Sequence, residues 1–189
     1  MRKLTVFNST SLDGYFADAR SDMSFAHNAH PDREWDAFGE GNASGGGGLV
    51  FGRITYELMA SFWPTPQAAQ QMPAVAERMN SLSKVVFSRT LQRVTWNNTR
   101  LAQGSLVDEI RRLKGEPGGD LAILGSGSLV AQLTQHRLID EYQIVVIPVA
   151  LGQGRTLFAG VGEPVSLRLV RTRAFSNGNV LLCYEPQAG

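Results

Sequence analysis

Short apolar, β-branched runs alternate with segments of helical spacing along most of the chain, and this alternation limits the fold more than any other feature. Strands are expected at residues 3–10, 49–51, 84–88, 94–101, 121–124, 139–151, 165–175 and 180–185. Strands joined by helical crossovers pair in parallel, with helices on both faces of the sheet. The last two runs flank Asn177-Gly178, a dipeptide typical of hairpin turns. The sequence therefore predicts an α/β fold with a mostly parallel central sheet and a C-terminal antiparallel hairpin.

Helices are expected between these strands, at residues 31–38, 53–61, 68–82 with a break at Pro73, 105–114 and from about 128 to 135. The run Gly45–Gly48 is interpreted as a flexible connector, because consecutive glycines lose much backbone entropy when they are ordered. Pro148 places its part of the strand at a bulge or a sheet edge. No repeat or linker composition interrupts the 189 residues, so residues 1–189 are predicted to form a single domain.

Composition and charge exclude several classes of function. The formal net charge of +1 is too small to favour nucleic acid or an anionic membrane as a partner. No apolar stretch approaches the roughly 20 residues of a membrane span, and no secretory signal precedes the first strand, so a cytoplasmic protein is expected. The only cysteine, Cys183, lies in an apolar run and is interpreted as a core residue. His27, His30 and His136 lack partners at zinc-site spacing, so no metal site is expected.

Three of the expected strands end in small, hydroxyl or basic residues that a helix or loop follows. These ends are Gly52-Arg53-Ile54-Thr55, Ser88-Arg89-Thr90 and Gly125-Ser126-Gly127-Ser128-Leu129. In a parallel sheet, ligands bind at the carboxyl ends of the strands. Helix N-termini attract phosphates, and arginine donates to them. Each segment alone also fits a plain turn or loop, but together they favour a bound dinucleotide, although no Rossmann G-x-G-x-x-G follows the first strand.

Five motifs, in this order along the chain, resemble those of the dihydrofolate-reductase-like superfamily. They are residues 10–17 (TSLDGYFA), 51–57 (FGRITYE), 86–89 (VFSR), 124–129 (LGSGSL) and 138–141 (LIDE). The most similar branch is typified by the C-terminal reductase domain of the bifunctional riboflavin-biosynthesis deaminase/reductase. The resemblance covers essentially the whole chain, and it implies the α/β fold that the alternation of strands and helices predicts.

The resemblance implies an NADPH site, which carries over position by position. Gly52, Arg53 and Thr55 would begin the helix on the pyrophosphate and adenosine-phosphate side of the cofactor, where Arg53 would meet the extra phosphate of NADPH together with Arg89. Ser88, Arg89 and Thr90 would contact the 2′-phosphate region. Gly125, Ser126, Gly127, Ser128 and Leu129 would form the glycine turn under the pyrophosphate. In folate reductases this turn is often Gly-Gly with a cis peptide bond, whereas here it is Gly125-Ser126, so either isomer stays open.

The resemblance also implies a substrate side. Asp13 and the irregular segment that runs to Trp35 would form a lid, and Asp36 would match the carboxylate of the folate reductases. Phe25 and Trp35 are aromatic residues of this region that either pack in the core or line a pocket for a flat ring. Two positions depart from the family. Leu124 replaces the acidic residue of the riboflavin reductases, and Val146 replaces the strand threonine of the folate reductases.

These features together predict an NADPH-dependent reductase that transfers a hydride to a small, heterocyclic or carbonyl-type substrate. Two alternatives stay open. One is the riboflavin-pathway 5-amino-6-(phosphoribosylamino)uracil reductase, and the other is a non-catalytic nucleotide-binding or sensing protein with the same fold. A homodimer is expected as well, because the C-terminal strands leave sheet edges that need cover.

Overall fold

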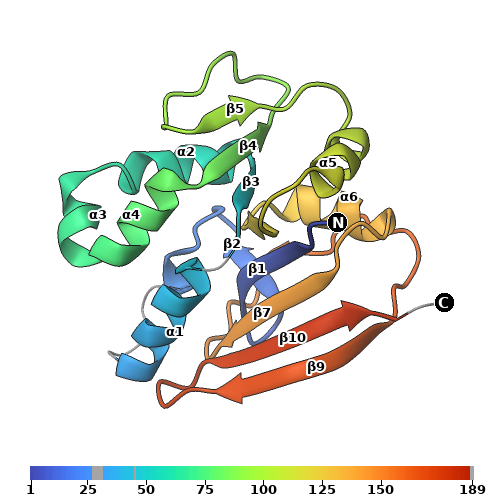
Figure 1. Ribbon diagram of the computed structural model, residues 1–189. Coiled ribbons are helices and arrows are strands. Elements are labelled where there is room, and N and C mark those ends of the chain that lie inside the picture. Colours follow the sequence, from blue (N-terminus) through green and yellow to red (C-terminus); the bar gives the residue numbers. More distant parts are fainter. Residues whose placement is uncertain (27–31, 45, 188–189) are drawn as a thin grey trace.

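The computed structural model describes residues 1–26, 32–44 and 46–187. An eight-stranded sheet forms its centre, in the order β5-β4-β3-β6-β1-β7-β10-β9 (Figure 1). The strands are β1 (Leu4–Ser11), β3 (Gly48–Gly52), β4 (Ser83–Phe87), β5 (Thr99–Leu101), β6 (Leu121–Leu124), β7 (Glu141–Ile147), β9 (Leu167–Ala174) and β10 (Val180–Pro186). The first six strands in this order, from β5 through β4, β3, β6 and β1 to β7, pair in parallel. The pairs β7–β10 and β10–β9 are antiparallel. The predicted fold class is therefore confirmed.

Helices cover both faces of the sheet. They are α1 (Arg33–Ser44), α2 (Arg53–Phe62), α3 (Pro66–Gln71), α4 (Pro73–Ser81), α5 (Leu106–Gly115) and α6 (Gly127–Gln135), with a short 3-10 helix η1 (Ser24–Ala26). Ile110 of α5 and Leu133 of α6 pack on one face against Val6 of β1. On the other face, α2 and α4 pack against β3 and β4, and α1 packs against β7 and β10. Because both faces are covered, strands β3 (GLVFG) and β6 (LAIL) are continuous apolar runs, as is typical of parallel sheets.

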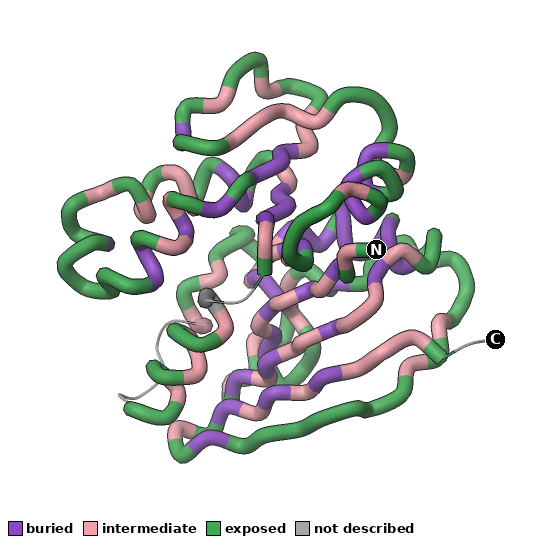
Figure 2. Tube along the Cα trace, in the orientation of Figure 1, coloured by how far each residue is buried: buried purple, intermediate pink, exposed green. Residues whose placement is uncertain are grey.

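The burial pattern follows this layering (Figure 2). Val6, Val50 and Ile123 of the central strands are fully buried. Strand β9 lies at the edge of the sheet and is exposed along nearly its whole length, including Leu169 and Val170. Cys183 on β10 is buried, as predicted. The uncovered edge is the kind of surface that led us to expect a homodimer, and that expectation stays a prediction.

The order of the strands reverses between β3 and β6. From β3 the chain continues through α2 towards β4, whereas from β6 it continues through α6 to β7 on the opposite side. Helices α2 and α6 therefore leave neighbouring strands on opposite faces of the sheet. In open α/β sheets, ligands bind in the crevice outside the carboxyl ends of two such strands. The fold places this crevice beside Gly52 and the segment that follows Leu124.

Gly47 and Gly48 of the glycine run are not a flexible connector, so that interpretation was wrong for these two residues. Gly48 is the first residue of β3 and is buried, and the Gly47 N–H donates to the Asp120 carbonyl oxygen over 2.6 Å. A Cβ on Gly47 would lie 2.6 Å from the Gly119 carbonyl oxygen. The glycines are needed here because two backbone segments approach each other too closely for a side chain. Gly45 lies outside the described residues.

A second, two-stranded sheet was not predicted. It consists of β2 (Tyr15–Asp18) and β8 (Gly154–Thr156), which pair antiparallel. Both strands are too short to show a period of two in the sequence, and their pairing joins segments far apart in the chain. This sheet ties the segment that follows β1 to the segment that follows β7, next to the carboxyl edge of the main sheet.

Several element boundaries also differ from those expected. Strand β7 ends at Ile147, directly before Pro148, because proline cannot donate to the ladder. Helix α1 continues to Ser44, and only Thr99–Leu101 of the segment 94–101 forms a strand. The C-terminal hairpin turns through a loop from Phe175 to Asn179, in which Gly178 has a φ of 89°.

Candidate functional site

A cavity of about 510 Å³ opens at the carboxyl edge of the sheet, where the strand order reverses. This volume lies within the range of roughly 300–1,000 Å³ that is usual for small-molecule sites. The lining residues are Phe16, Ala17, Ser21, Asp22, Met23, Gly52, Arg53, Ile54, Thr55, Leu58, Phe87, Ser88, Arg89, Thr90, Ser126, Gly127, Ser128, Leu129 and Arg155. All three of the strand ends singled out in the sequence contribute to this lining. Of their predicted site residues, only Gly125 does not line the cavity.

Two helix N-termini face this cavity without a capping side chain. Helix α2 follows Gly52 and α6 follows Ser126, and neither residue caps its helix through a side chain. By contrast, Thr65 caps α3 and Ser105 caps α5, while α4 begins at Pro73, which has no N–H. An uncapped N-terminus presents free N–H groups and a partial positive charge, which together attract anions. The cavity therefore contains two anion-attracting helix ends.

Ser126 leaves α6 uncapped because its side chain serves another purpose. Its hydroxyl oxygen accepts a hydrogen bond from the Gly52 N–H at 2.9 Å, and its own N–H donates to Thr55 Oγ1 at 3.1 Å. The two hydroxyl oxygens lie 3.1 Å apart. Ser126 and Thr55 are both buried, so these bonds tie the start of α2 to the start of α6. The two side chains thus position the helix ends.

The backbone between β6 and α6 takes an unusual course. Gly125 and Ser126 both have left-handed dihedral angles, with φ values of 58° and 57°. A Cβ on Gly125 would lie 2.9 Å from Thr55 Oγ1, which explains the glycine. The peptide bonds of the described residues are all trans, and this settles the isomer that the sequence left open.

Replacing Thr55 with valine should lower the free energy of unfolding by about 1–3 kcal/mol. Valine has the same shape but no hydroxyl, so the buried Ser126 N–H would lose its acceptor. Urea unfolding followed by circular dichroism measures the change. Thr55→Ser is the matched control, because it keeps the hydroxyl and should be much less destabilised. A Thr55→Val variant as stable as the wild type would contradict this role.

Three arginines line the cavity, and they differ in their partners. Arg53 donates to Glu57 over 2.8 Å, one helical turn along α2. Arg89, which follows β4, and Arg155, on β8, are exposed and have no ionic partner among the described residues. The Ser88 hydroxyl oxygen accepts hydrogen bonds from the N–H groups of Thr90 and Leu91, which fixes the turn that carries Arg89. Arg89 and Arg155 therefore retain free charge at the cavity.

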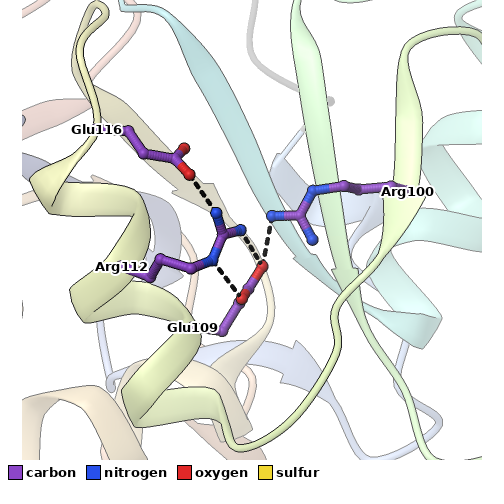
Figure 3. Close-up of polar contacts among 4 residues, drawn as sticks. All are labelled: Arg100, Glu109, Arg112 and Glu116. Carbon is purple, nitrogen blue, oxygen red and sulfur yellow. Dashed lines mark hydrogen bonds and ion pairs between the residues drawn. The ribbon is translucent and has the colours of Figure 1, made fainter.

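Two arginines of a second cavity, Arg100 and Arg112, show the opposite behaviour. This cavity, of about 410 Å³, lies near the amino end of β4, away from the first. Arg112 donates to Glu109 and Glu116, and Arg100 donates to Glu109 (Figure 3). The Arg112 guanidinium, with Arg100 beside it, holds the pKa of the Glu109 carboxyl below its usual value. The charges of Arg100 and Arg112 are committed to protein carboxylates, so these two side chains are poorly suited to an anionic ligand.

The remaining wall of the cavity comes from the segment after β1, which sequence analysis did not assign to the cofactor. Phe16 lies with its ring against Gly127, where a Cβ would come within 2.7 Å of the ring. Asp22 is an acidic residue of the lining, and the Ser24 hydroxyl and N–H hold the pKa of its carboxyl below the usual value. Asp22 is therefore ionised at neutral pH and acts as a hydrogen-bond acceptor. Phe16 belongs to the TSLDGYFA motif, and that membership was the available signal.

Asp13 does not line the cavity but holds its wall in place. Its carboxylate accepts from the N–H groups of Leu151 and Gly152, at 3.1 and 2.7 Å. These bonds connect the turn between β1 and β2 to the loop before β8. Hydrogen bonds from the Ser11 hydroxyl and from the two backbone N–H groups lower the pKa of Asp13 from 3.8 to about 2.

The lowered pKa of Asp13 predicts a pH dependence of stability. Because the pKa is lower in the folded state, the carboxylate stabilises the fold above about pH 4 and loses this effect as the pH falls towards 2. The unfolding free energies of the wild type and Asp13→Asn should therefore differ at neutral pH and converge between pH 4 and pH 2. Asp36→Asn is the control, because Asp36 is exposed and its side chain makes no hydrogen bond to any described residue. A difference that stays constant down to pH 2 would contradict the assignment.

The other residues predicted for the substrate side do not reach this cavity. Trp35 packs against Phe38 and Phe175, at ring distances of 5.5 and 5.0 Å, on the face that α1 covers. Phe25 packs against the same cluster of buried residues. Asp36 is exposed on α1. The structure therefore separates these residues from the strand ends that the sequence placed beside them, and Phe25 and Trp35 pack with the core.

The described residues contain neither a helix that could span a membrane nor a cluster of metal-binding side chains. None of their helices is long and apolar enough to span a membrane. No group of three or more His, Cys, Asp or Glu side chains in residues 1–26, 32–44 and 46–187 is placed to hold a metal ion. Two of the three histidines, His27 and His30, lie outside these ranges.

The sheet order, the reversal point and the cavity define a dihydrofolate-reductase-like α/β protein. The sequence matches the RibD C-terminal domain over residues 2–181, and the chain belongs to that family, a family of reductases. It is 30% identical to the Bacillus subtilis (strain 168) protein YyaP over 137 residues, 72% of each chain.

Solved structures agree with this membership. A protein from Shewanella sp. PV-4, assigned to riboflavin biosynthesis, is 26% identical and has a TM-score of 0.80 over 98% of this chain and 99% of that one. Dihydrofolate reductase from Enterococcus faecalis, complexed with NADP(H) and RAB-propyl, has a TM-score of 0.64 at 15% identity, over 98% of this chain and 97% of that one. The second likeness supports the fold alone. The resemblance that the five motifs indicated is thus confirmed at the level of the family and the fold.

Proposed function

We propose that this protein is an NADPH-dependent reductase that transfers a hydride to a small, heterocyclic or carbonyl-type substrate. One observation carries the proposal: two uncapped helix N-termini meet at one cavity, beside arginines that have no ionic partner among the described residues. Phosphates are among the anions that such N-termini and free arginines bind well. Membership of a reductase family supports NADPH as the phosphate-bearing ligand.

Each part of the cavity has a role in this proposal. The first-turn N–H groups of α2 and the N–H groups of Gly127 and Ser128 would bind the pyrophosphate. Arg89, with Ser88 and Thr90, would bind the 2′-phosphate. Apolar side chains, among them Phe16 and Leu129, would exclude water. When bound, NADPH would supply the hydride, and the protein would orient it.

Asp22 constrains the proton source. Because its pKa is lowered, it is ionised at neutral pH and would accept a hydrogen bond from the cofactor or the substrate. Apart from Asp22, no lining residue among the described ones is a carboxylic acid or a histidine. We therefore propose that the proton for the reduced substrate comes from solvent, without a lining side chain as the general acid.

The riboflavin-pathway uracil reductase is a second candidate. Family membership favours it, since the RibD C-terminal domain gives the family its name. Leu124 counts against it, because it stands where the riboflavin reductases carry an acidic residue before the glycine turn. Turnover of the phosphoribosylaminouracil substrate at a rate well above that of other heterocycles would establish this candidate.

The proposal is tested by binding and turnover on the same preparation. Calorimetric titration with NADPH should give saturable binding to one site per chain, and a panel of heterocyclic and carbonyl compounds should include one that oxidises NADPH. Tight binding without oxidation across the panel would favour a nucleotide-binding protein that has lost catalysis. An absence of NADPH binding would overturn the proposal.

A further inference from the structure

We infer that Arg155 is a phosphate-binding residue of the cofactor site, and that it contacts the pyrophosphate that NADPH and NADH share. The inference rests on the proposed function and deepens it, because it separates a general dinucleotide contact from the contact that selects NADPH. Sequence analysis did not single out Arg155, and its neighbours in the chain show no strand-end pattern of the kind that identified Arg53 and Arg89.

The position of Arg155 follows from the small second sheet. Arg155 lies on β8, opposite Ala17 of β2. Its guanidinium carbon lies 5.7 Å from the centroid of the Phe16 ring. The same ring lies against Gly127, the first residue of α6. Phe16 therefore lies between Arg155 and the uncapped N-terminus of α6, and Arg155 lines the same cavity as Gly127 and Ser128.

The charge of Arg155 is available to a ligand. Other arginines near the C-terminal strands have partners: Arg168 pairs with Glu185 at 2.9 Å and Arg173 with Glu34 at 2.6 Å. Arg155 has no carboxylate within ion-pair distance in the described part of the chain. Its guanidinium lies over the face of the Phe16 ring. A guanidinium held over a ring keeps its hydrogen-bond donors free at its edge. These donors are suited to the oxygens of a phosphate.

Arg155 and Arg89 approach the cavity from opposite sides. Arg89 follows β4, while Arg155 lies beside the segment that follows β1, three strands further along the sheet. Neighbouring strands lie about 4.8 Å apart, so β4 and β1 are separated by roughly 14 Å across the edge of the sheet. The two arginines are thus placed for different phosphate groups. Arg155 stands on the α6 side, where the helix N-terminus would bind the pyrophosphate.

The inference predicts equal losses for the two dinucleotides. Arg155→Ala should raise the dissociation constants of NADPH and of NADH by about the same factor, roughly ten-fold, because the lost contact lies in the part they share. The ratio of the two constants should stay at the wild-type value. Arg89→Ala, in contrast, should change the ratio. Arg155→Lys keeps the charge without the planar fork and should fall between the wild type and Arg155→Ala.

The controls separate this inference from the proposed function. Arg93→Ala removes an exposed arginine that does not line the cavity and should leave both constants unchanged. Melting temperatures of all variants identify any loss that comes from unfolding. If the wild type binds dinucleotides and Arg155→Ala binds both as tightly, the inference is wrong while the proposed function stands. A change for NADPH alone, or only in the KM of a phosphorylated substrate, also overturns it. A wild type that binds neither dinucleotide overturns both.

Discussion

Replacing Arg89 with alanine should remove most of the protein's preference for NADPH over NADH. We expect the wild type to bind NADPH about ten- to a hundred-fold more tightly, because a charge-assisted hydrogen bond contributes roughly 1.5–3 kcal/mol. Arg53 was predicted to share this role, but it is engaged with Glu57 at 2.8 Å. Arg89 has no ionic partner among the described residues, so the larger part of the effect should come from it. Calorimetric titration of both cofactors into both proteins measures the ratio.

The control for the lost NADPH preference is a variant of a nearby arginine that leaves the preference unchanged. Arg93→Ala removes the same charge four residues further along, outside the cavity, and should leave the preference intact. Equal dissociation constants for NADPH and NADH in the wild type would contradict the role of Arg89. So would an Arg89→Ala variant that lost the same factor for both cofactors.

Replacing Gly127 with valine should lower NADPH affinity at least ten-fold and also lower the free energy of unfolding by about 1–3 kcal/mol. Gly127 begins α6 and is buried, and its backbone is not left-handed. A Cβ there would lie 2.7 Å from Cε1 of Phe16, so the ring would have to move. Because Phe16 supports Arg155 and lies against the start of α6, its movement should disturb the phosphate-binding part of the cavity.

Two further variants separate affinity from stability. Gly115→Val is the matched control, since a Cβ on Gly115 would have no neighbour within 4 Å, and it should bind NADPH normally. In a Phe16→Ala background, Gly127→Ala should cost less stability than it does in the wild type, because the ring that it would meet is gone. Melting temperature and the NADPH dissociation constant are measured on each variant. If folded Gly127→Val binds NADPH with wild-type affinity, the turn that begins α6 is not part of the cofactor site.

Much of the fold and part of the site were predictable because their signals are local. Apolar runs such as Leu121–Leu124 form strands where they were expected, and Ser105 caps α5 as its pattern indicated. The three strand ends come together at one cavity for a topological reason, since the carboxyl ends of parallel strands share one edge of the sheet. Local sequence was sufficient to predict this part of the site, because the parallel sheet itself brings the strand ends together.

Other features depend on contacts between segments far apart in the chain, and local patterns do not contain them. Gly47 is a glycine because Gly119 lies against it, and no signal near Gly47 indicates that neighbour. Ser126 was predicted to contact the cofactor, yet its hydroxyl serves the Gly52 N–H and its N–H serves Thr55. Trp35 was placed near the substrate by its position at the end of an irregular segment, but it lies on α1 and packs against Phe175 instead.

The sequence by itself determined the α/β class, the family and the three strand ends, because periodicity, turn residues and motif order are properties of neighbouring residues. The tertiary structure alone decided which of those residues face the cavity and which brace it. It also brought Phe16, Asp22 and Arg155 into the lining, through the pairing of β2 with β8. Those two short strands form only where Asp13 and the main sheet hold the segments together. Their stability comes from contacts with distant segments, so the sequences of the two strands alone do not predict that they form.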